Sequence, residues 1–191
     1  MDAFLTSTGL VAVAEIGDKT QLLAIVLATR FRRPLPIIAG ILLATLANHA
    51  LAAFAGQVAA AFLEGQWFRL AVAASFVAMG LWTLVPDKLD EDEQPRARGG
   101  AFLTTLVAFF LVEMGDKTQI ATVALGARFE NLIAVTAGTT LGMMIANVPA
   151  VLLGNALVQR ISMKAVRIVA ALSFVAVGLW MAAEVLLDLA G

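Results

Sequence analysis

The sequence predicts an all-α integral membrane protein of six transmembrane helices, arranged as two inverted repeats of three helices. Three observations lead to this prediction: an apolar composition, six apolar stretches of spanning length, and an internal repeat. Of the 191 residues, 61% are hydrophobic, and the mean hydropathy is +0.91. Soluble domains contain roughly 45–50% apolar residues, so this composition excludes an ordinary water-soluble fold.

The charge balance and residue usage narrow the class of protein further. The net charge is -1, and no basic stripe suggests a nucleic-acid partner. The absence of cysteine excludes disulfides and thiolate metal sites. The N-terminus lacks the basic start of a signal peptide, and Glu15, Asp18 and Lys19 interrupt its apolar run. We therefore expect the first apolar segment to remain in the mature protein.

Six stretches have the length and apolarity of membrane spans. A helix needs about 20 mainly apolar residues to cross the hydrocarbon core. The predicted spans are 4–29, 35–62, 67–85, 101–127, 131–158 and 165–187. Little of the chain remains for a soluble domain, so membrane lipid should surround most of the protein.

An internal repeat relates the two halves of the chain at a shift of 98 residues without a gap. AEIGDKTQ at 14–21 aligns with VEMGDKTQ at 112–119, and SFVAMGLW at 75–82 aligns with SFVAVGLW at 173–180. We predict a first three-helix repeat at 1–85, a second at 101–191, and a solvated acidic linker at 86–100 between them. The two repeats should form one integrated transport domain.

The orientation of the repeats follows from their odd number of spans, because the second copy must enter the membrane in the opposite direction. Basic residues outside the motifs concentrate in the loops after spans 1, 3 and 5. They are Arg30, Arg32, Arg33, Lys88, Arg96, Arg98, Arg160, Lys164 and Arg167. The other side carries only Arg69 and Arg128. The positive-inside rule therefore places the linker in the cytoplasm and both termini outside. Inverted repeats of this kind favour transport.

Each repeat carries a charged motif near the middle of its first span, at 15–21 and at 113–119. A charge at the bilayer centre costs at least about 2.5–3.5 kcal/mol, so six of them require a purpose. On a continuous helix, Glu15, Asp18 and Lys19 would share one face. Lys19 would then pair with Glu15 four residues earlier. A buried structural ion pair is the alternative interpretation of one such motif.

Inverted symmetry would bring four carboxylates around one cavity: Glu15, Asp18, Glu113 and Asp116. Such oxygen ligands suit Mn²⁺, Ca²⁺ and Mg²⁺. With Lys19 and Lys117 the cluster carries a charge of -2, which one divalent cation neutralises. The empty cluster should favour protonation, because burial and mutual repulsion oppose its charge. This provides a route for exchange of the cation against protons.

Other polar residues are predicted to support the site or to act as further ligands. They are Lys19, Thr20, Gln21, Lys117, Thr118, Gln119, Asn48, His49 and Asn147. The threonines and glutamines could equally bond neighbouring helices. His49 aligns with Asn147, so it is either a ligand or a hydrogen-bonded packing residue. As a ligand it would favour Mn²⁺ over Ca²⁺.

The doubled Glu-x-Gly-Asp-Lys-Thr motif closely resembles the cation/proton exchanger family of bacterial manganese exporters and eukaryotic Golgi manganese and calcium transporters. The resemblance covers essentially the whole chain, and both motif copies are complete. It implies that Glu15, Asp18, Glu113 and Asp116 bind the cation and that the motif lysines and threonines support them. It further implies a bacterial exporter of Mn²⁺, or of Ca²⁺, in the cytoplasmic membrane, coupled to protons or an ion gradient.

Three other functions are compatible with parts of the sequence. An exporter of a small organic cation, such as a basic amino acid, could use the same carboxylates. An intramembrane metalloenzyme is less favoured because the chain has no His-Glu-x-x-His pattern. A passive cation channel is disfavoured by the two lysines in the site. We therefore expect a transporter rather than an enzyme, with no cofactor apart from the transported cation, and the sequence predicts no oligomeric state.

Overall fold

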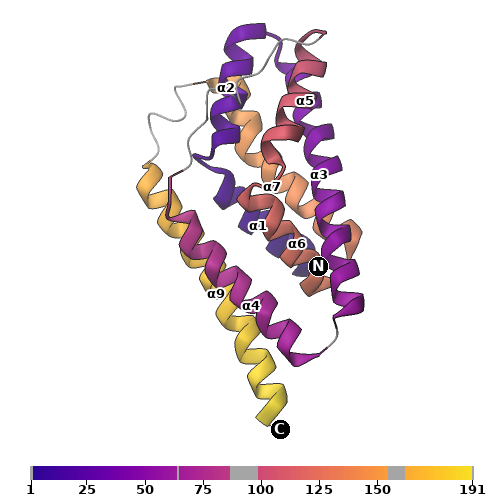
Figure 1. Cartoon of the computed structure of the whole chain (residues 1–191). Helices are drawn as coiled ribbons and strands as arrows, with labels where there is room; N and C mark the ends of the chain where they lie inside the picture. Colours follow the sequence, from indigo (N-terminus) through magenta and orange to yellow (C-terminus); the bar gives the residue numbers. More distant parts are fainter. Residues whose placement is uncertain (1, 64, 87–98, 155–161, 191) are drawn as a thin grey trace.

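The computed structural model describes residues 2–63, 65–86, 99–154 and 162–190, and every regular element within them is a helix. In chain order these helices are α1 (Asp2–Glu15), α2 (Lys19–Phe31), α3 (Pro34–Phe62), α4 (Gln66–Thr83), α5 (Ala101–Glu113), α6 (Lys117–Phe129), α7 (Leu132–Leu153) and α9 (Met163–Ala190). They form an elongated bundle, with α4 and α9 side by side along one flank (Figure 1). The predicted all-α class is confirmed for the described residues.

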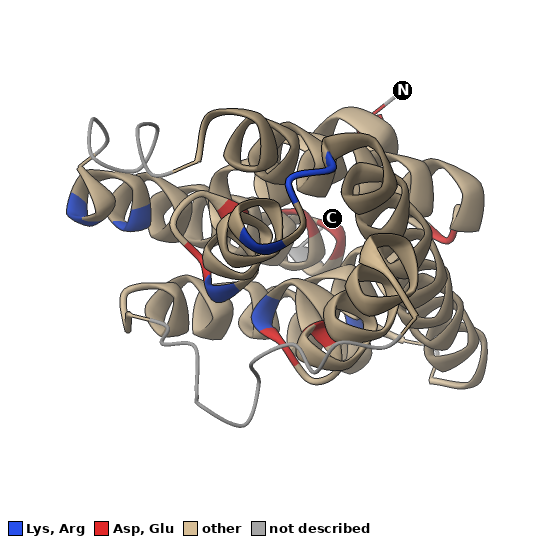
Figure 2. Ribbon diagram, turned by 90° about the horizontal axis from the view of Figure 1, so that it is seen from above, with Lys and Arg blue, Asp and Glu red and all other residues tan. Residues whose placement is uncertain are grey.

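The surface of the bundle is typical of a protein surrounded by lipid. Within the described residues, α3, α7 and most of α9 are long and apolar enough to cross a membrane. Large apolar side chains are exposed along α3, including Leu46, Leu51 and Phe54. Figure 2 shows a ribbon that is almost entirely tan, with charged residues confined to short segments. Exposed apolar surface of this extent indicates a membrane protein.

The predicted spans 4–29 and 101–127 are not single continuous helices, so the shared helical face expected for Glu15, Asp18 and Lys19 does not form. Each is divided at its motif, between α1 and α2 at residues 16–18 and between α5 and α6 at residues 114–116. The cause is local, because Gly17 has φ +84 and Gly115 has φ +80. Side chains other than glycine adopt this left-handed region with difficulty. Each half-helix is therefore shorter than the hydrocarbon thickness.

The remaining helices agree with the predicted segments within a few residues, except at the end of α7. This helix stops at Leu153, whereas the predicted span runs to 158, of which 155–158 lie outside the described residues. Most of the linker, 87–98, also lies outside them. So do four of the basic residues used for the orientation, namely Lys88, Arg96, Arg98 and Arg160.

Local backbone geometry recurs at the 98-residue shift. Asp18 and Asp116 precede their helices with φ -78 and φ -75. Arg32 and Glu130 end the same helices in the left-handed region, with φ 53 and φ 49. Aligned residues thus adopt the same conformation in both halves.

Contacts between the halves recur in the same way. Helix α1 packs against α7, and its counterpart α5 packs against α3. Where α4 crosses α9, a Cβ added to Gly80 would lie 2.8 Å from the Ala171 carbonyl oxygen, and one added to Gly178 would lie 2.8 Å from that of Ala73. The 98-residue shift relates Gly80 to Gly178 and Ala73 to Ala171, so the same close contact occurs twice with the halves exchanged.

Two clusters of buried apolar side chains lie on either side of the helix breaks. The α1/α6 cluster also draws on α4 and α9 and includes Leu10, Phe76 and Phe174. The α2/α5 cluster also draws on α3 and α7 and includes Leu23 and Phe109. Because each broken helix contributes one half to each cluster, the motifs are held between them.

We predict that Gly56→Ala destabilises the protein by about 1–3 kcal/mol, the range for overpacked sites. A Cβ at Gly56 would lie 2.0 Å from the Val123 carbonyl oxygen, forcing α3 away from α6. The matched control is Gly9→Ala, because a Cβ at that helical position meets nothing within 4 Å. Thermal unfolding of the detergent-purified variants measures both effects. Equal melting temperatures for the two variants would contradict the close α3–α6 packing.

Candidate functional site

The two helix breaks place an acidic residue on each side of a tight turn. Glu15 ends α1 and Glu113 ends α5, whereas Asp18 and Asp116 are the N-cap residues of α2 and α6. The backbone N–H of Asp18 donates to the Glu15 carbonyl at 3.1 Å, and Asp116 repeats this bond to Glu113 at 3.1 Å. The turns therefore hold two carboxylates of each motif at the same depth in the bundle.

A glutamine in each motif ties its break to a helix of the other half. The Gln21 side chain accepts from the Gly17 N–H at 3.0 Å and donates to the Ala146 carbonyl on α7 at 3.1 Å. Gln119 accepts from the Gly115 N–H at 2.7 Å and donates to the Asn48 side chain on α3 at 2.9 Å. The interpretation that the glutamines bond neighbouring helices is therefore confirmed.

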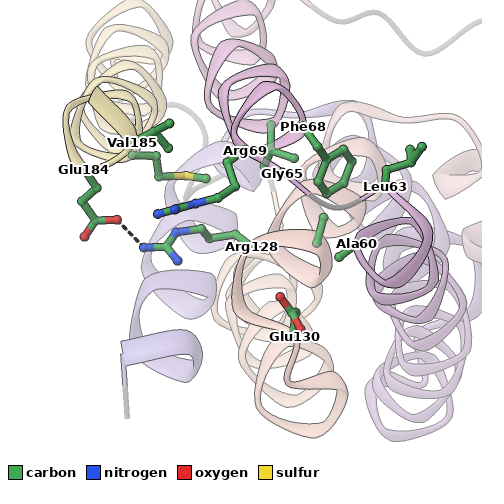
Figure 3. Close-up of a pocket in the computed structure, with 12 residues that line it drawn as sticks. Ala60, Leu63, Gly65, Phe68, Arg69, Arg128, Glu130, Glu184 and Val185 are labelled. Carbon is green, nitrogen blue, oxygen red and sulfur yellow. Dashed lines mark hydrogen bonds and ion pairs between the residues drawn. The ribbon is translucent and has the colours of Figure 1, made fainter. Parts of the chain in front are cut away.

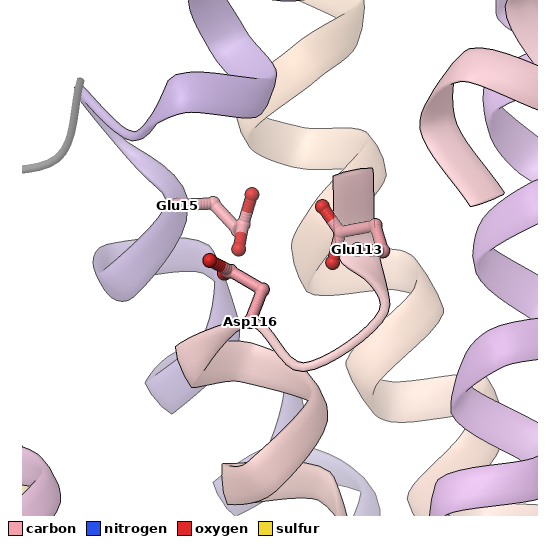
Figure 4. A group of neighbouring side chains, drawn as sticks. All are labelled: Glu15, Glu113 and Asp116. Carbon is pink, nitrogen blue, oxygen red and sulfur yellow. The ribbon is translucent and has the colours of Figure 1, made fainter. Parts of the chain in front are cut away.

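Three carboxylates from the two breaks converge on one small volume. Glu15, Glu113 and Asp116 each offer an oxygen, and these oxygens lie within 4.8 Å of one another (Figure 4). Glu15 and Glu113 are fully buried, and Asp116 is 6% exposed. Asp18, the fourth predicted residue, is not part of this group. Three of the four predicted carboxylates therefore lie together, and Asp18 lies outside their group.

One oxygen of each glutamate in this group is hydrogen-bonded and the other is not. Glu15 Oε2 accepts from the Thr20 hydroxyl at 2.7 Å, and Glu113 Oε2 accepts from that of Thr118 at 3.2 Å. Glu15 Oε1 and Glu113 Oε1 have no hydrogen-bond partner among the described residues. Buried carboxylate oxygens without a hydrogen-bond donor are unusual. Such oxygens can instead coordinate a cation.

The predicted pairing of Lys19 with Glu15 required a continuous helix, and the break removes that geometry. Lys19 Nζ instead lies 3.5 Å from Asp116 Oδ1, so the ion pair joins the two halves. Lys117 donates to the Val85 carbonyl at 3.1 Å and lies over the Trp82 ring at 5.7 Å.

Asp18 lines a cavity of about 20 Å³ beside the carboxylate group, a volume suited to about one water molecule. Asp116 and Thr118 also line this cavity, which connects Asp18 with the group. Thr83 and Arg167 complete part of its wall. The sequence analysis did not include these two residues in the site. The repeat offered one signal, because Arg167 aligns with Arg69 and both lie near the start of an apolar span.

The remaining predicted residues lie around the group in different ways. The Asn48 amide donates to the Phe110 carbonyl at 2.9 Å, which fixes it as a structural partner of Gln119. Asn147 lies beside Glu15, and its Oδ1 has no hydrogen-bond partner among the described residues. His49 is fully buried, but the carboxylate group does not include it.

The site has the chemistry of a hard-cation ligand set. The three close carboxylates and Lys19 sum to a charge of -2, and every close candidate ligand is an oxygen. Such ligands suit Mg²⁺, Ca²⁺ and Mn²⁺. A group of this charge inside an apolar bundle requires either a cation or protons for balance.

The family model described as "Divalent cation/proton antiporter GDT1" matches residues 3–91 and 101–188. The chain belongs to this family. The resemblance inferred from the sequence is thereby confirmed, and the family is one of antiporters rather than enzymes. The first residues of the two matched segments are related by the 98-residue shift, so the match covers both halves of the chain.

Three named relatives match nearly the whole chain. A Vibrio cholerae protein named "Putative manganese exporter" is 49% identical over 90% of this chain and 86% of its own length. A GDT1-like protein of Synechocystis is 32% identical over 91% of this chain and 93% of its own. GDT1-like protein 5 of Arabidopsis thaliana is 30% identical over 94% of both chains. No solved structure matches the chain.

We predict that Gln119→Leu destabilises the protein by about 0.5–1.5 kcal/mol per lost hydrogen bond, because it leaves the Gly115 N–H and the Asn48 oxygen without their partner. The variant should also bind divalent cations more weakly, since the second break would lose its support. Gln57→Leu is the matched control, because the Gln57 amide makes a single exposed bond to the Glu130 carbonyl. Thermal unfolding with and without Mn²⁺ measures both effects. A Gln119→Leu variant indistinguishable from Gln57→Leu would contradict this role.

Proposed function

We propose that this GDT1-family protein exports divalent cations, chiefly Mn²⁺, in exchange for protons. The observation that carries the proposal is the buried group of Glu15, Glu113 and Asp116, whose oxygens lie within 4.8 Å of one another. The relative named "Putative manganese exporter" supports Mn²⁺ as the substrate. A spherical ion suits this compact oxygen group better than the ammonium group of an amino acid.

Both motifs serve one shared site in this proposal. Glu15 comes from the first break and the other two carboxylates from the second, so neither half alone supplies the ligands. Asp18, which lines the adjoining cavity, receives the ion at the edge of the group. Lys19 and the threonines of the two motifs orient the carboxylates.

Proton exchange follows from charge balance. The bound divalent cation neutralises the -2 charge of the three carboxylates and Lys19. When the cation leaves, protons take its place, because three neighbouring carboxylates cannot all stay ionised in an apolar interior without compensation. A proton gradient across the membrane then drives the cation outward.

The arrangement in the membrane is part of the same proposal. Six spans, in inverted repeats at 1–85 and 101–191, would place the site at the bilayer midplane, with the linker 86–100 in the cytoplasm. The recurrence of backbone conformations and helix contacts at the 98-residue shift supports the repeats. The basic residues of the described loops support an orientation with both termini outside the bacterial cytoplasmic membrane.

The preference for Mn²⁺ over Ca²⁺ rests on the relative named "Putative manganese exporter". The three close carboxylates suit either ion, because both prefer oxygen ligands. His49 is not among the close ligands, so imidazole coordination does not enter the argument.

We predict that Glu113→Gln abolishes Mn²⁺ transport, because it removes one of three charges that the ion requires. The matched control is Asp2→Asn, which neutralises an exposed acidic residue at the start of α1. Metal-dependent fluorescence quenching in proteoliposomes measures uptake. Transport retained by Glu113→Gln would exclude the glutamate as an essential ligand.

The same proteoliposomes test the coupling and the substrate. We expect an imposed pH gradient to drive Mn²⁺ uptake, and we expect Ca²⁺ and Mg²⁺ to be transported more slowly. Internal pH should change in step with Mn²⁺ movement when a pH-sensitive dye is enclosed. Mn²⁺ uptake that ignores the gradient and moves no protons would contradict exchange.

A further inference from the structure

The α4–α9 pair packs against only one half of each broken helix. Helix α9 packs on α1, and α4 packs on α6. At the repeat shift, the counterparts of these contacts are α4 with α5 and α9 with α2. Packing of comparable extent between those helices does not occur in the described part of the chain. This departure from the repeat distinguishes the two ends of the bundle.

The inner ends of α4 and α9 stop at the helix breaks. Lys117, which begins α6, donates to the carbonyl of Val85 just beyond α4. Met163, which begins α9, packs directly on Gly17 in the first break. In Figure 1 the pair runs from the level of the breaks to the C-terminal end of the bundle. It therefore covers α1 and α6 and leaves α2 and α5 without this cover.

A cavity of about 260 Å³ opens at the end covered by the pair (Figure 3). We call it the vestibule, and its lining includes Phe68, Arg69, Arg128, Glu130 and Glu184. None of the three close carboxylates lines it. Under the proposed orientation, the vestibule lies on the extracytoplasmic side, the side to which an exporter must deliver its cation.

An apolar barrier separates the vestibule from the site. Along α4, Val72 lines the vestibule and Thr83 lines the small cavity at the site, and Phe76 lies between them. Along α9, Phe174 lies between the vestibule and Arg167 in the same manner, and the two phenylalanine rings are in contact at 6.3 Å between centroids. Both rings are fully buried in the α1/α6 cluster. A hydrated ion cannot pass this barrier unless the α4–α9 pair moves.

Two ion pairs lie at the vestibule, and only one of them joins the α4–α9 pair to the rest of the bundle. Arg128 on α6 forms an ion pair with Glu184 on α9, and this ion pair links the two helices α4 and α9 to the rest of the bundle. Arg69 on α4 pairs with Asp188 on α9 at 2.9 Å, so this pair lies within the flank. If α4 and α9 move together as a unit, the Arg128–Glu184 ion pair breaks and the Arg69–Asp188 ion pair stays intact.

We propose that the vestibule is the exit path of the exported cation and that the α4–α9 pair is its gate, held closed by Arg128 and Glu184. This inference rests on the proposed function and adds the moving element and the latch. In the exit-open arrangement, the α4–α9 pair separates from α1 and α6. Helix α4 then packs on α5, and α9 packs on α2. The repeat makes that second arrangement available, because those surfaces are the counterparts of the ones now in contact.

Site-directed labelling tests the gate directly, because the chain contains no cysteine and each introduced thiol is the only one. Ala121→Cys places the thiol in the α1/α6 cluster at a fully buried position of α6. Its reaction rate with a membrane-impermeant maleimide, added from the vestibule side, reports opening of the barrier. Leu63→Cys, at an exposed position of the vestibule lining, provides the reference rate.

Arg128→Ala should raise the labelling rate of the Ala121→Cys protein about two- to fivefold, the population change expected for a partly exposed ion pair. Glu184→Gln, which keeps the side-chain shape, should do the same. Arg69→Ala is the matched control and should leave the rate unchanged. Equal rates in all variants, or an equal increase with Arg69→Ala, would overturn the gate. Labelling requires no metal, so its outcome is independent of whether Mn²⁺ is the substrate.

Discussion

Mutual repulsion among three buried carboxylates is the constraint on which the rest of the structure depends. Two unit charges 4 Å apart interact by about 4 kcal/mol at an effective dielectric constant of 20. One oxygen each of Glu15, Glu113 and Asp116 lies within 4.8 Å of the others, in a bundle whose other interior groups are mainly apolar. The two threonine hydroxyls and Lys19 offset only part of this repulsion. The site is therefore stable only when a cation or protons complete it.

The broken helices are the device that makes this arrangement possible. Each break turns an aspartate and a glutamate inward, and its glycine N–H would be without a partner in an intact apolar environment. The side-chain oxygen of the motif glutamine accepts a hydrogen bond from that N–H. The glutamine amide also holds the break against a helix of the other half. Backbone geometry, charge placement and contact between the halves are thus fixed together by seven consecutive residues, at 15–21 and again at 113–119.

Much of this arrangement could be predicted from the sequence, because it follows from composition and repetition. The apolar stretches predicted the helical class. The doubled motif predicted that four carboxylates would meet, and three of them, Glu15, Glu113 and Asp116, lie together. The motif glycines permit local unwinding, but they do not by themselves predict a break, because one glycine in an apolar helix lowers helix stability by only about 1 kcal/mol. The partner of Lys19 depended on the other half of the chain, and so did the separate position of Asp18. Neither is encoded in the spacing within one motif.

The contacts that recur with the halves exchanged also bear on how such a protein can change over time. An interface of this isologous kind uses one set of residues twice, so in a dimer of identical chains every mutation would alter both sides at once. A fused chain is free of that restriction. His49 and Asn147 already differ at equivalent positions. Fusion of two copies therefore allows each face of the molecule to be adjusted separately, which permits a preferred direction of transport.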